Sequence, residues 1–110
     1  MGIWNVISRW RNTRRAALMG SEVAQRSVGP VLGRVRRRAA TMRIAEARGY
    51  VRARALEIVH RELAALQKGR AKLDPALQIE IVSHATDAVV VRVMAELRSV
   101  PKAAEQRRAA

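Results

Sequence analysis

Residues 34–68 read RVRRRAATMRIAEARGYVRARALEIVHRELAALQK, without proline and with a single glycine, Gly49. Ala, Arg, Leu and Glu dominate this stretch, and all four are good helix formers. Its apolar residues recur at the spacing of a helix face that packs against a core. They are Ile44, Ala47, Val51, Ala55, Ile58, Val59 and Leu66. We therefore predict one long central helix, roughly 50 Å long at about 1.5 Å per residue.

Asp74 and Pro75 mark the start of a second helix, since an N-cap residue followed by proline at the first helical position is a specific start signal. The segment from Asp74 to Ser99 is apolar over more than half of a helix circumference, and we expect Pro101 to end this helix. A helix with so broad an apolar surface is normally buried from several directions, so we expect it to join copies of the chain. The predicted interface comprises Leu77, Ile81, Val82, Ala85, Val89, Val93 and Leu97. The alternative is a β-hairpin of residues 78–82 and 89–94, because Val and Ile favour strands.

The N-terminal segment, Met1 to Met19, has the pattern of a short amphipathic helix, with Ile3, Trp4, Ile7 and Trp10 on one side. Gly20 and Ser21 provide a stop and a new N-cap. The Gly29-Pro30 pair then predicts a bend before the long helix, since proline removes a backbone donor and clashes with the preceding turn.

The predicted fold is therefore all-α: one long central helix, a short N-terminal amphipathic helix and a C-terminal apolar helix, completed by self-association. We divide the chain into an Arg-rich N-terminal arm over 1–43, a helical body over 44–100 and a basic tail over 101–110. A central helix of that length is too long for the rest of a 110-residue chain to cover, which is why self-association is expected.

Charge is distributed unevenly along the chain. Its 22 Lys and Arg stand against 9 Asp and Glu, for a formal net charge of +13. Residues 1–43 hold ten arginines and one acid, Glu22, whereas residues 44–110 are nearly balanced. This asymmetry is typical of an anion-binding arm attached to a structural body.

The basic residues of the arm form the candidate binding site. Arginine presents a planar fork of donors that engages phosphate oxygens in pairs. The candidate nucleic-acid-binding residues are Arg9, Arg11, Arg14, Arg15, Arg34, Arg36, Arg37, Arg38 and Arg43. The chain lacks a helix-turn-helix pattern, a zinc-finger motif and an aromatic RNA-binding motif. We therefore expect binding to the phosphate backbone, independent of sequence, by an architectural or packaging subunit of a homo-oligomer.

Two other functions fit the same residues. Trp4, Ile7 and Trp10, flanked by arginines, resemble in pattern an amphipathic helix that lies on an anionic membrane. A basic helical chain also suits a structural subunit of a larger protein complex or filament.

Other chemistry finds little support in the sequence. The chain has no cysteine, which excludes disulfides and thiolate chemistry. We expect no enzymatic activity, no cofactor and no metal site, because no nucleophile is paired with a base and the Glu57–His60 spacing lacks a second such element. No signal-peptide pattern or membrane-spanning run is present. The expected location is the cytoplasm or a nucleoprotein or virion assembly.

Overall fold

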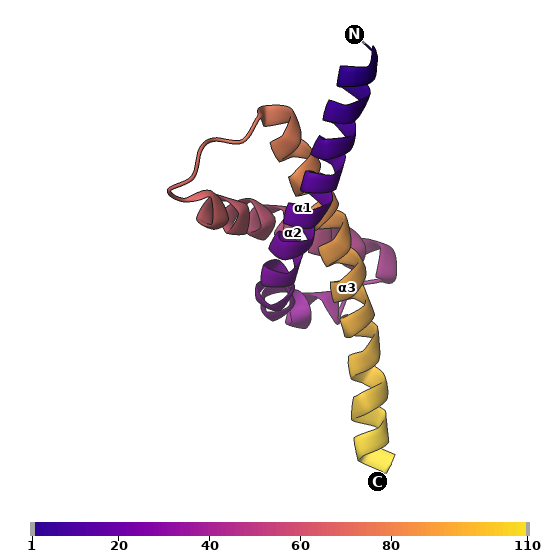
Figure 1. Ribbon diagram of the computed structural model, residues 1–110. Coiled ribbons are helices and arrows are strands. Elements are labelled where there is room, and N and C mark those ends of the chain that lie inside the picture. The colour runs from indigo at the N-terminus through magenta and orange to yellow at the C-terminus, as the bar shows by residue number, and fades with distance from the viewer. Residues whose placement is uncertain (1, 110) are drawn as a thin grey trace.

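Three helices make up the computed structural model of the chain: α1 (Gly2–Ala39), α2 (Ile44–Gln67) and α3 (Pro75–Ala109) (Figure 1). The structure describes the backbone of residues 2–109, and the side chains of all of these except 4, 5, 8–10, 12 and 100–109. Within this range there is no strand. The all-α prediction is confirmed, and residues 78–94 form part of a helix rather than a hairpin.

The molecule is elongated, with principal extents of 64 × 29 × 25 Å. The three helices meet in a central region, and α2 lies across the other two (Figure 1). The first turns of α1 and the last turns of α3 project from this region toward opposite ends of the molecule. Both projecting ends therefore extend beyond the packed part of the chain.

The core consists mainly of small and β-branched side chains. On α1 its members are Ala16, Val23, Ala24, Ser27, Val31, Val35 and Ala39; on α2 they are Ala47, Val51, Ala55, Ile58, Val59 and Leu63. On α3 they are Leu77, Ile81, Val82, Ala85, Thr86, Val89, Val90, Val93 and Met94. Successive core positions are mostly three or four residues apart, the spacing of the ridges through which helices interlock.

The residues predicted to join copies of the chain lie in this core. Leu77, Ile81, Val82, Ala85, Val89 and Val93 are buried, and Leu97 is partly buried against them. The three helices of one chain already cover these side chains. A contact between copies would therefore need another surface.

The predicted short N-terminal helix is wrong, because α1 continues without interruption from Gly2 to Ala39. Gly20 does not end the helix; it is buried where α1 approaches His84 of α3. Pro30 also lies inside α1, on its exposed side. The carbonyl of Arg26, which loses its helical partner to this proline, belongs to an exposed residue as well. Water can solvate that carbonyl, so burial of Val23, Val31 and Val35 on the other side maintains the helix.

The predicted long central helix over residues 34–68 is also not observed, since the chain turns at residues 40–43. The amide and the hydroxyl of Thr41 both donate hydrogen bonds to the Arg38 carbonyl, at 3.1 and 2.8 Å. These bonds satisfy an orphan carbonyl at the end of α1 and direct the chain away from the helix axis. Met42 packs against the core, and Ile44, which we expected to face the core, is exposed.

The predicted helix start at Asp74 is confirmed. α3 begins at Pro75, and the Gln78 amide donates to the Asp74 carbonyl at 2.9 Å. The predicted end at Pro101 is wrong, because the helix continues to Ala109. Proline inside a helix removes one backbone donor and clashes with the preceding turn, a local cost of about 3 kcal/mol, and α3 continues through it.

Candidate nucleic-acid interface

The last turns of α1 carry four arginines that are all exposed: Arg34, Arg36, Arg37 and Arg38. Val31, Val35 and Ala39 take up the core-facing side of these turns. At about 100° per residue, the four arginines occupy the remaining arc of the helix. They therefore surround the end of α1 on every side that the core leaves free.

The turn after α1 adds a fifth guanidinium to this end of the molecule. Only four residues separate α1 from α2, and the last of them, Arg43, is exposed and occupies the N-cap position of α2. Its backbone is extended there, and its side chain makes no capping hydrogen bond. Arg34, Arg36, Arg37, Arg38 and Arg43 are called the central cluster below.

The central cluster has no carboxylate partner among the side chains that the structure describes. The ion pairs in that part of the chain join Arg26 to Glu22 at 3.4 Å, Arg52 to Asp87 at 2.8 Å, and Arg54 to Glu57 at 3.1 Å. All three pairs involve arginines outside the cluster. The acids that form ion pairs therefore lie elsewhere, and no described carboxylate neutralises these five guanidinium groups.

Like charges at this density repel one another. Arg34 and Arg38 are four residues apart, a spacing at which a like-charge pair costs about 0.2–0.5 kcal/mol of helix stability. Part of this cost is offset because Arg36, Arg37 and Arg38 lie in the last turn of α1, where the helix dipole favours cations. An external anion would relieve the remainder.

The other predicted arginines form a separate surface, the N-terminal cluster of Arg9, Arg11, Arg14 and Arg15. Arg11, Arg14 and Arg15 are exposed, and the side chain of Arg9 lies outside the described residues. Nineteen helical residues separate Arg15 from Arg34, roughly 30 Å at about 1.5 Å per residue. The nine predicted residues therefore fall into two groups, one in the first half of α1 and one at its end and in the following turn.

The three residues of the membrane prediction belong to the projecting turns of α1. Ile7 is exposed, whereas the side chains of Trp4 and Trp10 lie outside the described residues. Ile3, Val6 and Leu18 are further exposed apolar residues of α1.

Sequence reasoning missed Arg98, which lies 55 residues after Arg43 in the chain. Arg98 and Arg36 both line a hollow of about 380 Å³ between the end of α1, the start of α2 and α3. Met42, Met94 and Leu97 form part of its apolar wall. Only helix packing brings Arg98 to the central cluster, so no local pattern could have identified it.

Metal binding, a membrane-spanning helix and similarity to known proteins also bear on the function of this surface. The described residues include no group of three His, Asp or Glu side chains that could hold a metal ion. None of the helices, over the same residues, has an apolar stretch long enough to span a bilayer. Comparison of the chain with family models, curated proteins and solved structures gave no match.

Proposed function

We propose that the chain is a non-catalytic protein that binds the phosphate backbone of nucleic acid independently of base sequence. The observation that supports this most is the central cluster: five exposed guanidinium groups, none paired with a carboxylate among the described side chains. A surface with this density of positive charge attracts polyanions, and the planar guanidinium group of arginine matches the geometry of a phosphate group.

Binding without base readout follows from the kind of surface involved. The arginines surround the end of a helix and continue into a turn, instead of lining one face of an exposed recognition helix. Such an arrangement contacts phosphates from several directions and presents no single row of side chains to base edges. An architectural or packaging role is the class of function that uses contacts of this kind.

The decisive experiment measures how affinity for duplex DNA depends on salt. On a log–log plot, affinity falls with a slope of about −0.9 for each phosphate contacted. We expect the Arg34→Gln, Arg37→Gln, Arg38→Gln triple variant to flatten that slope by about three, with equal effects on unrelated duplex sequences. The matched control replaces Arg54, Arg61 and Arg92 by Gln, which removes the same charge elsewhere and leaves the slope nearly unchanged. Equal slopes for the two triple variants would refute the proposal.

A second candidate function is binding to an anionic membrane through the projecting turns of α1. Ile3 and Leu18 are 76% and 66% exposed, although both are large and apolar. Leu18 lies two residues from both Ala16 and Gly20, so it points away from the side of α1 that faces the core. Exposed apolar residues between arginines are the pattern of a helix that lies in the membrane interface.

Tryptophan emission separates the two candidates. Membrane insertion would shift the emission of Trp4 and Trp10 to shorter wavelength with anionic vesicles but not with zwitterionic ones, and Ile3→Ser with Ile7→Ser would abolish the shift. Vesicle binding that remains in this double variant would exclude an in-plane helix.

A further inference from the structure

A second surface, which meets the central cluster at one end only, runs along the seam between α2 and α3. Three hollows succeed one another there, with volumes of about 390, 530 and 400 Å³. His60, Pro75 and Gln78 line both the first and the second, and Arg52 lines both the second and the third. Neighbouring hollows therefore share walls, and together they form one groove.

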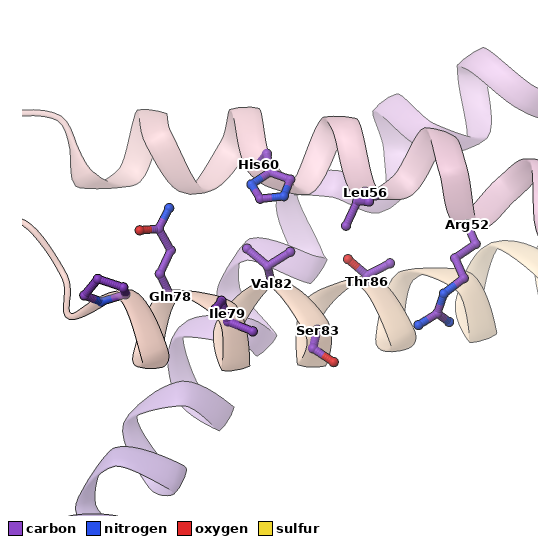
Figure 2. A pocket seen from close by; sticks show the side chains of 9 residues that line it. Arg52, Leu56, His60, Gln78, Ile79, Val82, Ser83 and Thr86 are labelled. Atoms are coloured by element: carbon purple, nitrogen blue, oxygen red, sulfur yellow. The ribbon is translucent and has the colours of Figure 1, made fainter.

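The groove continues into the hollow at the end of α1, since Met94 and Arg98 line both that hollow and the third one. Apart from this last hollow, no residue of α1 lines the groove. α2 and α3 form its two walls, and Figure 2 shows its central part, with Leu56 and His60 on one wall and Ile79 and Val82 on the other. It thus follows most of the length of α2, and α1 covers only one end of it.

Apolar side chains line the groove while remaining accessible to solvent. Ile79 is 70% exposed, Val91 is 72% exposed and Leu56 is 43% exposed. Thr86 lies among them, nearly fully buried, and its hydroxyl has no hydrogen-bond partner in the described structure. Figure 2 shows this hydroxyl in the space between α2 and α3. Exposed apolar side chains gathered along one groove are typical of a surface that binds a partner.

All the charged residues that line the groove are basic except one. Its basic lining residues are Arg36, Arg48, Arg52, Arg70, Lys72 and Arg98. Asp87 is the one acid among its lining residues, and it pairs with Arg52 at 2.8 Å. Both members of this pair are more than half exposed, so the pair is weak and a carboxylate from outside can compete for Arg52.

We propose that this groove binds an amphipathic helix of a partner protein, with its apolar face on the groove and acidic side chains toward the basic residues of α2 and of the two ends of the groove. A helix in a groove places residues at i, i+3, i+4 and i+7 in contact, which suits a groove with exposed apolar side chains between two helices. The positive charge of the groove indicates which kind of helix it binds. The projecting turns of α1 from a second copy are apolar enough, but they carry Arg9, Arg11, Arg14 and Arg15 and no acid, so the basic walls repel them.

The test uses a fluorescent peptide of about 18 residues, roughly 27 Å as a helix, with Leu at the contact positions and Glu elsewhere. Two control peptides have Lys in place of Glu, or the same composition in scrambled order. We expect the acidic amphipathic peptide to bind at least about tenfold more tightly than either control. Equal binding of the scrambled peptide would reduce the interaction to net charge and overturn the proposal, as would equal binding of the Lys peptide.

Variants of the chain locate the site on the groove. Ile79→Ser should weaken peptide binding about fivefold or more, whereas Leu18→Ser, at a similarly exposed position on α1, should leave it unchanged. Arg48→Glu should weaken binding, whereas Arg61→Glu, on α2 but outside the groove lining, should have little effect. All four positions are exposed, so the variants should remain folded.

One variant should strengthen binding. Asp87→Asn removes the groove's acid and releases Arg52, so affinity for the acidic peptide should rise severalfold. Its control is Glu22→Gln, which breaks the Arg26–Glu22 pair on α1 and should leave affinity unchanged. Equal effects of these two variants would contradict the proposal. So would a dimer in sedimentation experiments that the peptide dissociates, because the groove would then hold a second copy.

Discussion

Gly20 of α1 and His84 of α3 define the closest approach recorded at any glycine of the described chain. A Cβ atom added to Gly20 would lie 2.8 Å from Cδ2 of His84 and 3.3 Å from both its Cβ and Cγ. Cβ atoms essentially never lie this close to another atom, so any larger residue at position 20 would force the His84 side chain to move.

Gly20→Ala is therefore expected to destabilise the fold by about 1–3 kcal/mol, the usual cost of overpacking. By helix propensity alone, replacing glycine with alanine would stabilise the helix by about 1 kcal/mol. A loss of stability in Gly20→Ala would therefore show that the added methyl clashes with His84. Gly49→Ala is the control: its added methyl meets nothing within 4 Å, and it should stabilise α2. Urea unfolding midpoints measure both changes. His84→Ala should recover part of the loss in Gly20→Ala, and a loss of the same size in the double variant would contradict this explanation.

Ile81 and Ile79 are neighbours on α3 with opposite environments. Ile81 is fully buried and Ile79 is 70% exposed. Ile81→Ala should cost about 2–5 kcal/mol of unfolding free energy, and Ile79→Ala should change it by less than about 0.5 kcal/mol. If Ile81 lies in the core of a single chain, the urea midpoint should not depend on protein concentration. A midpoint that rises with concentration would instead place Ile81 between copies.

Pro30 lies on the exposed side of α1 and leaves the Arg26 carbonyl without its helical donor. Proline inside a helix costs about 3 kcal/mol relative to alanine, although it also restricts the unfolded chain by up to about 1 kcal/mol. We therefore expect Pro30→Ala to stabilise the protein by about 1–2 kcal/mol, as measured by thermal or urea unfolding. An unchanged or lower stability would mean that a bend at Pro30 is required for packing.

The separation of the two arginine clusters on α1 sets the length of duplex that can reach both. A distance of roughly 30 Å corresponds to about nine base pairs at 3.4 Å each. The salt dependence of binding should therefore be less steep for a hairpin with a stem of about six base pairs than for a long duplex. In the Arg11→Gln, Arg15→Gln variant the two slopes should become equal. Equal slopes in the unmodified protein would show that one cluster alone binds DNA.

Local sequence patterns predicted the helical content and part of the helix boundaries. Asp74 and Pro75 identified the start of α3, because capping and proline geometry act within one turn. The apolar spacing of α2 identified Val51, Ala55, Ile58 and Val59 as core residues, and all four are buried. The same spacing was wrong for Ile44, which is in the first turn of α2 and exposed. The spacing of apolar residues shows which face of a helix packs against the core. It does not show how far along that face the neighbouring helices extend.

The positions of glycine and proline did not predict where α1 ends. Gly20 predicted an end of the first helix that does not occur, Pro30 lies inside α1, and the absence of both residues from 34–48 predicted a continuous helix where the chain turns at 40–43. Intrinsic preferences of about 1–3 kcal/mol per residue are small beside the burial of a helix face. Contact with His84 and burial around Val31 therefore outweigh the local signals.

The arginines were identified from the sequence, but the residues from distant parts of the chain that lie beside them were not. Their number, and the near absence of acids before residue 44, are properties of composition. The approach of Arg98 to Arg36 and the groove between α2 and α3 depend on how the helices cross.

The amino-acid sequence by itself thus determined that this chain is helical, strongly basic and apolar on defined helix faces, because propensity, charge and periodicity are properties of neighbouring residues. Tertiary structure decided where the helices end, that residues 77–97 serve the chain's own core, and which side chains share a surface. Those outcomes depend on contacts between residues distant in the chain, whose energy no local pattern records.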